Sequence, residues 1–252
     1  MILTLLCYNI RFGGKGRESF IAEVIRSVAP DLVLFQEAID PTVIESISKT
    51  TEMPFWASMR NHSNAFCSRI EIAHHQWHHP KGSRHSFLEV VPKGTEVRIF
   101  GVHLRAMFSK WGEQRRVIEI QALLNAIKLH QEGFHVLTGD FNSLAPDELL
   151  NKTKLPHWIR TMVWLGGRDI QRDTVKLIQD NGYLDGFRNL DKDVPGYTFP
   201  TRDPHVRFDY VFVPKQHFTN LIECKVIDQD PARSASDHFP LLSRLNIAER
   251  RL

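Results

Sequence analysis

The sequence predicts an α+β fold in which two packed β-sheets form the centre and helices cover their outer faces. Short apolar segments rich in Val, Ile, Leu and Phe recur along the chain and outnumber the helical segments. Each helical segment carries one apolar stripe, which has to be buried against another element. Two sheets packed face to face, with the helices outside, bury all of these surfaces in one simple arrangement.

Eight segments are predicted as strands because they are short and apolar. They cover residues 2–8, 31–35, 64–68, 86–91, 96–102, 134–138, 208–213 and 239–245. The first is too short for a signal peptide and lacks a basic leader and a cleavage site, so we expect it to be a strand.

Helices are predicted where apolar residues recur at steps of three and four. The first spans residues 18–28 and ends before Pro30, and the second spans residues 113–130. Residues 42–49 and 171–181 are further candidates. These elements imply one domain over residues 1–252.

The composition is that of a soluble globular protein, with 42% hydrophobic and 24% charged residues. The three cysteines are far apart and form no CxxC pair, so we expect neither a disulfide framework nor a structural zinc site. No apolar run is long enough to cross a bilayer. We therefore expect a cytoplasmic protein with no membrane association and no obligate protein partner.

The net charge of +3 suits an anionic substrate. It is smaller than expected for a protein dedicated to nucleic-acid binding, which has a concentrated basic surface.

Polar side chains that could bind a metal follow several predicted strands or precede the last two. They are Asn9, Glu37, His103, Asp140, Asn142, Asp209, Asp237 and His238. A residue of this kind is usually only a turn residue when it occurs alone. Together they supply what a hard cation and an in-line attack on phosphorus require.

Oxygen ligands from Asn9 and Glu37 suit Mg²⁺ or Mn²⁺. Hydrolysis also needs an oriented, partly deprotonated water and neutralisation of the charge that develops on the phosphate oxygens. Carboxylates suit the first task and imidazoles the second. The sequence therefore predicts a divalent-metal-dependent hydrolase of phosphate esters.

Six motifs carry a family resemblance. In chain order they are CYNIR, LFQE, GVHL, GDFNS, FDYVFV and SDHFP, and they extend from Cys7 to Pro240. This set resembles the endonuclease/exonuclease/phosphatase superfamily. The resemblance implies a deoxyribonuclease I-like, four-layer α/β/β/α sandwich with the site at one end of the paired sheets.

The resemblance also implies roles for residues at matching positions. Asn9 and Glu37 match the main metal ligands, with Asp237 close by. Asp140 matches the residue that orients or deprotonates the attacking water. Asn142 matches the residue that positions this water and the phosphate.

The remaining implied roles concern the phosphate itself. His238 would contact the scissile phosphate, while Asp209 accepts a hydrogen bond from the other ring nitrogen and favours the protonated imidazole. His103 would donate to a non-bridging oxygen. We also expect substrate contacts from Arg11, Arg105 and Arg207.

The chain departs from the apurinic-site endonucleases of this superfamily at two positions. Those enzymes have an acidic residue where this chain has Arg11, and a tyrosine in the segment where it has His103. They also have a longer, more basic surface. The departures favour general phosphodiester or phosphomonoester hydrolysis over DNA repair.

Two segments leave alternatives open. The run HHQWHH, residues 74–79, predicts an exposed edge hairpin, with a metal site as the alternative. Residues 151–170 could be a packed insertion or a lid that selects substrate.

Three functions follow, in order of preference. The first is a phosphodiesterase or nuclease, and the second is a phosphomonoesterase acting on nucleotide, sugar, inositol or lipid phosphates. The third is a noncatalytic nucleic-acid-binding module. The expected partner is a phosphate-ester substrate, with nucleic acid as one candidate.

Overall fold

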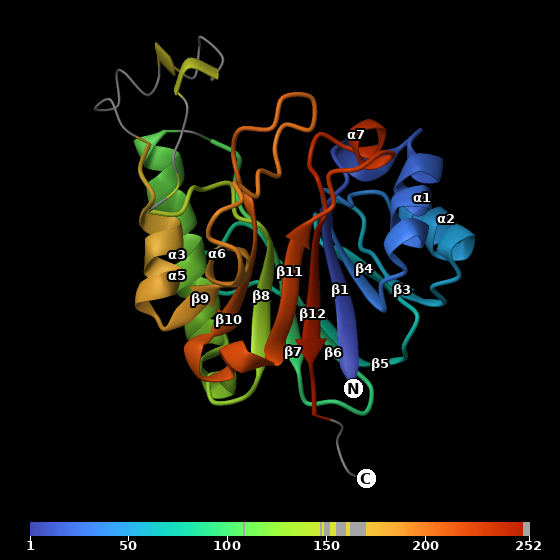
Figure 1. Cartoon of the computed structure of the whole chain (residues 1–252). Coiled ribbons are helices and arrows are strands. Elements are labelled where there is room, and N and C mark those ends of the chain that lie inside the picture. Colours follow the sequence, from blue (N-terminus) through green and yellow to red (C-terminus); the bar gives the residue numbers. More distant parts are fainter. Residues whose placement is uncertain (108, 147, 149–151, 155–159, 162–169, 249–252) are drawn as a thin grey trace.

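The computed structural model describes residues 1–107, 109–146, 148, 152–154, 160–161 and 170–248. Two six-stranded sheets form its centre (Figure 1). The first has the order β11-β12-β1-β2-β4-β3, with strands β11 (Leu221–Val226), β12 (Leu241–Asn246), β1 (Ile2–Asn9), β2 (Leu32–Gln36), β4 (Ala65–Ser68) and β3 (Phe55–Ala57). The second has the order β5-β6-β7-β8-β10-β9, with strands β5 (Ile72–His78), β6 (Phe87–Pro92), β7 (Arg98–His103), β8 (His135–Asp140), β10 (Asp209–Pro214) and β9 (Tyr183–Asp185).

Helices form the two outer layers (Figure 1). The first sheet is covered by α1 (Glu18–Val28) and α2 (Pro41–Thr51), and the second by α3 (Lys110–Ala126) and α5 (Asp173–Asp180). Shorter helices are α6 (Gly186–Leu190) and α7 (Ala232–Ala235). Turns of 3₁₀-helix occur at Phe12–Gly14, Lys128–His130, Lys152–Lys154 and Lys215–Asn220. The predicted four-layer α/β/β/α sandwich is therefore confirmed.

The alternation of side chains along β1 explains why this strand needs a layer on each face. Leu3 and Leu5 point into the core between the two sheets, where they join residues of β6, β7, β8 and β10. Leu6 and Tyr8 point to the opposite face and pack with residues of α1 and α2. Because both faces are apolar, the strand has to lie between another sheet and a helical layer.

One parallel pair in each sheet positions the ends of the strands. β1 pairs parallel with β2, and α1 lies between them in the chain. β7 pairs parallel with β8, and α3 forms that crossover. Because parallel strands end at the same edge, each sheet presents two carboxyl-terminal strand ends side by side.

The eight predicted strands are all present, with ends that differ by no more than two residues from those predicted. Strands β3, β9 and β11 were not predicted. The 113–130 helix begins earlier than predicted, at Lys110, and its last turn is the separate Lys128–His130 segment. Most of the 151–170 insertion lies outside the described residues.

The HHQWHH run is confirmed as part of an edge strand, since β5 is the end strand of the second sheet and pairs with β6. Nε2 of His78 lies 2.6 Å from a carboxylate oxygen of Glu89, which also pairs with Arg98. The described helices include none long and apolar enough to span a membrane.

Arg207 is fully buried, and this overturns the prediction that it contacts substrate. Its guanidinium donates to Asp185 Oδ1 at 2.9 Å and to Glu148 Oε1 at 2.6 Å. Two carboxylates and a fixed cation in the interior form a structural ion pair, because each partner removes the cost of burying the other.

Replacing Arg207 with methionine should destabilise the protein strongly. Arg207→Met leaves Asp185 and Glu148 buried without their cation, so we expect the free energy of unfolding in urea to fall by about 3–5 kcal/mol. The control is Arg202→Met at an exposed position of the same loop, which should change it by less than about 0.5 kcal/mol. Equal values for the two variants would contradict a structural role for Arg207.

Candidate active site

The strand pairing gathers five of the predicted polar residues at one end of the two sheets. Asn9 is the last residue of β1. Glu37 directly follows β2, which runs parallel to β1. In the second sheet His103 pairs with Asp140 at the ends of β7 and β8. β10 is antiparallel to β8 and starts at this same edge, where Asp209 pairs with Asp140.

Asn9 joins the two sheets. Its side-chain amide is fully buried and donates to Asp140 Oδ2 at 3.0 Å and to Glu37 Oε1 at 3.3 Å. One carboxylate from each sheet is therefore held against the same amide group.

The turn after β1 supports the same two residues through its backbone. The N–H of Arg11 donates to Asn9 Oδ1 at 2.9 Å, and the N–H of Phe12 donates to Glu37 Oε2 at 2.5 Å. Positive φ angles occur at Arg11, Phe12 and Glu37, and residues other than glycine adopt such angles at a cost in energy. The backbone of this turn is therefore held in a strained form that fixes the Asn9 and Glu37 side chains.

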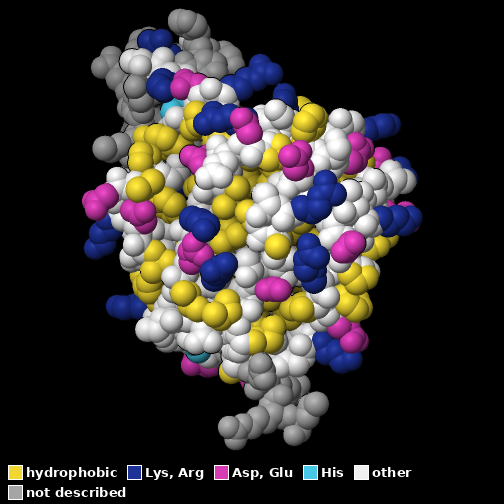
Figure 2. Space-filling model, turned by 45° about the vertical axis from the view of Figure 1, so that its right-hand side comes forward, with side chains coloured by type: hydrophobic (Ala, Val, Ile, Leu, Met, Phe, Trp, Pro, Cys, Tyr) yellow, Lys and Arg dark blue, Asp and Glu magenta, His cyan; other side chains and the backbone are white. Residues whose placement is uncertain are grey.

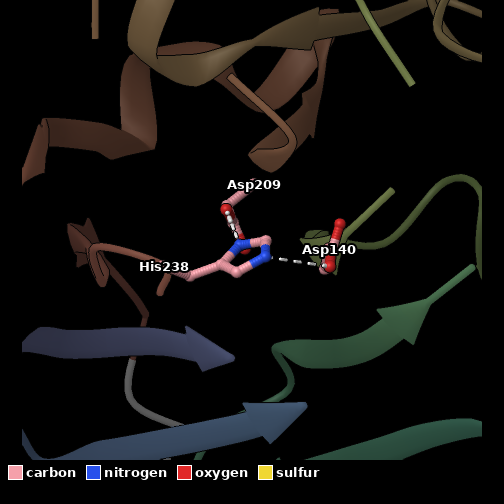
Figure 3. Close-up of side chains that lie close together, drawn as sticks. All are labelled: Asp140, Asp209 and His238. Atoms are coloured by element: carbon pink, nitrogen blue, oxygen red, sulfur yellow. Dashed lines mark hydrogen bonds and ion pairs between the residues drawn. The ribbon is translucent and has the colours of Figure 1, made fainter. Parts of the chain in front are cut away.

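Asp209 and His238 form a buried carboxylate–imidazole pair (Figure 3). The Asp209 Oδ2 to His238 Nδ1 distance is 2.8 Å. Burial lowers the pKa of His238, but the charges of Asp209 and Asp140 outweigh it and raise the pKa to about 10. The imidazole is therefore protonated at neutral pH and directs its Nε2 toward Asp140.

Asp140 lies between the two imidazoles. Its Oδ2 is 3.8 Å from Nε2 of His238 and 3.9 Å from Nε2 of His103, and its Oδ1 accepts from the backbone N–H of Asn142 at 2.9 Å. Burial raises the pKa of Asp140, while His238 opposes this shift. A carboxyl group with a raised pKa close to two imidazoles can exchange a proton near neutral pH.

His103 differs from His238 in its charge. Burial lowers the pKa of His103, so this imidazole is neutral at neutral pH. Its Nδ1 is hydrogen-bonded to the hydroxyl of Ser63, whose oxygen also accepts from the backbone N–H of Glu37. Ser63 thus connects His103 with Glu37, and nothing in the sequence around a single loop serine indicates this role.

The glycine before Asp140 allows the close approach of β8 to β7. A Cβ atom at Gly139, whose φ is 148°, would lie 1.8 Å from the carbonyl oxygen of Val102. Any side chain there would push apart the strands that bring His103 and Asp140 together. Beyond this strand end, Asn142 is buried and donates to the carbonyl of Leu104 at 2.9 Å.

The remaining predicted residues lie at the rim. Arg11 and Asp237 form an ion pair at 3.2 Å, with 48% and 31% of their side chains exposed. The Arg105 guanidinium lies 4.9 Å from the ring centroid of Trp111. These residues are accessible, in contrast to the buried Asp140 and Asp209.

The donor set fits a hard divalent cation. Three carboxylates meet here, from Glu37, Asp140 and Asp209. When all three are ionised, the imidazolium of His238 compensates one negative charge and leaves two uncompensated. Ligand atoms of Asp140, Asp209 and His238 also lie within 4.8 Å of one another. The Nδ1 atom of His238 is already bonded to Asp209, so the oxygens of Asn9, Glu37 and Asp140 are the better donors.

The distribution of charged side chains on the surface indicates what kind of ligand the protein can bind. On the face that Figure 2 shows, Lys and Arg side chains are interspersed with Asp and Glu, and no continuous basic area covers it. This face matches the small net charge of the chain.

Comparison with solved structures gives the same fold for several enzymes. A 3′-5′ exonuclease, NExo, from Neisseria meningitidis has a TM-score of 0.70 and 16% identity, with 97% of this chain and 100% of that chain covered. An AP endonuclease from Archaeoglobus fulgidus has a TM-score of 0.68 and 16% identity, covering 96% and 98%. Truncated TDP2 from Caenorhabditis elegans has a TM-score of 0.65 and 16% identity, covering 98% of both chains.

The sequence itself also identifies a family. A search of curated proteins gave no match. The model of the endonuclease/exonuclease/phosphatase family matches residues 6–238, which include all six motifs except the last residues of SDHFP and span most of the chain. The chain therefore belongs to the endonuclease/exonuclease/phosphatase family.

Proposed function

We propose that this protein is a divalent-metal-dependent phosphodiesterase or nuclease. The observation that carries the proposal is the buried arrangement of Asp140 and the Asp209–His238 pair beside Asn9 and Glu37. It combines a carboxyl group able to exchange a proton, a fixed imidazolium and the acidic oxygen ligands of Glu37. This combination suits hydrolysis of a phosphate ester and has no structural need of its own, since buried charges cost stability.

Asn9 and Glu37 would hold the cation, with Mg²⁺ or Mn²⁺ as the proposed ions. When bound, the ion supplies positive charge to the phosphate oxygens. Asp237 lies nearby at the rim and pairs with Arg11, so it would support the site without binding the ion directly.

The chain's own residues perform the remaining steps. The carboxylate of Asp140 orients a water molecule and accepts its proton, while Asn142 helps to position the water. His238, held protonated by Asp209, donates from Nε2 to a phosphate oxygen as charge develops there. The neutral His103 donates a second hydrogen bond from the opposite side, and Arg11 and Arg105 contact the substrate at the rim.

Nucleic acid is the preferred substrate class. The structural neighbours include enzymes described as a 3′-5′ exonuclease, an AP endonuclease and a 3′ phosphatase bound to a DNA hairpin. The last of these keeps a phosphomonoesterase as the second candidate. Rates for bis(p-nitrophenyl) phosphate and p-nitrophenyl phosphate under matched conditions separate the two functions. The three buried, free cysteines are consistent with the cytoplasm as the proposed location.

Replacing Asp140 should remove most of the activity. Asp140→Asn keeps the shape of the side chain but cannot accept the proton of water, so we expect kcat to fall by about 10²–10⁴-fold. The readout is Mn²⁺-dependent hydrolysis of bis(p-nitrophenyl) phosphate. The control is Asp180→Asn on the surface of α5, which should retain wild-type rates. A wild-type rate for Asp140→Asn would contradict the role of Asp140 as the base.

Replacing Glu37 should weaken the response to metal. Glu37→Gln removes one negative ligand, so the Mn²⁺ concentration for half-maximal activity should rise by at least about tenfold. Excess chelator should abolish wild-type activity, and added Mn²⁺ should restore it. Activity that persists in chelator would contradict metal dependence.

Replacing Asp209 should change the pH dependence. A pKa of about 10 means that His238 stays protonated at neutral pH and loses its proton as pH rises through that value. Asp209→Asn removes the main charge that raises this pKa, while burial still lowers it. We therefore expect the alkaline limb of the kcat/KM profile to move to lower pH.

The Asp209–His238 pair should also make the free energy of unfolding depend on pH. Its contribution is complete below about pH 6.5, the ordinary pKa of histidine, and is lost as pH rises through about 10. The wild type should therefore lose more unfolding free energy than Asp209→Asn between these values. Superimposable pH profiles for the two proteins would contradict the pairing.

A further inference from the structure

A groove of about 750 Å³ opens beside the active site. It lies where the turn after β1, helix α1, the loop at residues 199–202 and helix α7 come together. The residues that characterise its lining are Arg11, Arg17, Phe199, Arg202, Arg233 and Asp237. We call it the arginine groove.

The arginine groove shares a wall with the catalytic residues. Asp237 directly precedes His238 in the chain, and the ring centroid of Phe199 is 4.8 Å from that of His238. The backbone N–H of Arg11 binds Asn9. A ligand whose phosphate contacts Nε2 of His238 can therefore extend into this groove.

The groove carries excess positive charge. Four guanidinium groups face one carboxylate among its lining residues. Asp237 pairs with Arg11, whereas Arg17 and Arg233 donate to backbone carbonyls, including those of Ile10 and Thr201. Hydrogen bonds to neutral carbonyls orient a guanidinium but leave its charge uncompensated.

Arg202 is the groove cation best placed to bind a ligand. Its side chain is exposed, and no carboxylate of the described residues pairs with it. Arg17 and Arg233, in contrast, use their guanidinium groups to connect the loops around the groove. A guanidinium can make two parallel hydrogen bonds to a phosphate, and these charge-assisted bonds are stronger than its bonds to a neutral group.

We propose that the arginine groove binds a second phosphate of the substrate, adjacent to the scissile one. The inference rests on the proposed function and narrows it to substrates that carry at least two phosphates. Asp140 and Glu37 make the catalytic pocket negative enough for a cation, while the adjoining groove is positive and suits an anion. The second phosphate could belong to a nucleic-acid strand or to a small bisphosphate, since the recognised chemistry is the same.

The test compares esters that differ by one phosphate. The single-phosphate probes are thymidine 5′-(p-nitrophenyl phosphate) and thymidine 3′-(p-nitrophenyl phosphate). The two-phosphate probes are the 3′-phosphorylated derivative of the first and the isomer with the two groups exchanged, which together cover both strand directions. For the wild type, we expect kcat/KM for one of the two-phosphate probes to exceed that for its matching single-phosphate ester by about tenfold, equivalent to about 1.4 kcal/mol.

Arg202→Glu should remove this advantage by replacing attraction with repulsion. The ratio of the kcat/KM values should fall to about one, while hydrolysis of the matching single-phosphate probe stays within about twofold of wild type. The control is Arg26→Glu, which should keep the wild-type ratio. Arg26 is an exposed arginine on α1 and lies outside the groove. Urea unfolding of each variant checks that the fold is intact.

Three results would overturn the proposal: equal kcat/KM for esters with one and two phosphates, an unchanged ratio in Arg202→Glu, or equal losses for both esters in that variant. If the wild type hydrolyses none of the esters, the proposed function fails separately. Titration calorimetry with thymidine 3′,5′-bisphosphate then still tests the groove, because an equal Kd for wild type and Arg202→Glu would overturn it. A tighter Kd for the wild type would support it.

A last comparison assigns the source of the second phosphate. If single-stranded octathymidylate is cleaved with a higher kcat/KM than the two-phosphate ester, and Arg202→Glu lowers it, the groove binds a strand. If the octamer gives no further gain, the groove is matched to a small bisphosphate. Both results support the second-phosphate site, which is absent if Arg202→Glu has no effect on either substrate.

Discussion

The parallel pairing of β1 with β2 and of β7 with β8 is the constraint on which the site depends. A parallel pair needs a long crossover, and here α1 and α3 provide it while covering the outer faces of the sheets. The same connections therefore build the layers and bring four strand ends to one edge. β10 and β12 are antiparallel to their neighbours and begin at that edge, which adds Asp209 and His238.

Charge is distributed in two adjoining regions. The inner region holds the buried Asp140 and Asp209 and the half-buried Glu37, and the single imidazolium of His238 does not balance them when all three are ionised. The outer region is the arginine groove, where guanidinium groups exceed carboxylates. Burying carboxylates without equal positive charge is unfavourable unless a cation binds. The arrangement is therefore explained more easily by a ligand that brings both a cation and several negative charges than by stability alone.

Much of the fold could be predicted from the sequence, because the interior strands are continuous apolar segments and α1 has one apolar face. β11 could not, since it is an edge strand in which buried Leu221 and Cys224 alternate with exposed positions such as Ile222. The candidate site residues could be named from their positions at strand ends. Their contacts could not, because spacing does not show that Ser63 meets His103 or that Arg207 meets carboxylates from two distant segments.

We propose that Asn9 and Glu37 hold a divalent cation next to Asp140, His238 and the scissile phosphate. A crystal structure with Mn²⁺ and a phosphorothioate dinucleotide, phased at the manganese absorption edge, measures this directly. We expect an anomalous peak at about 2.0–2.3 Å from oxygens of Glu37 and Asn9, with a phosphate oxygen also bound and His238 facing that phosphate. A peak bonded to His238 and Asp209 instead, or a phosphate bound away from Asp140, would contradict it.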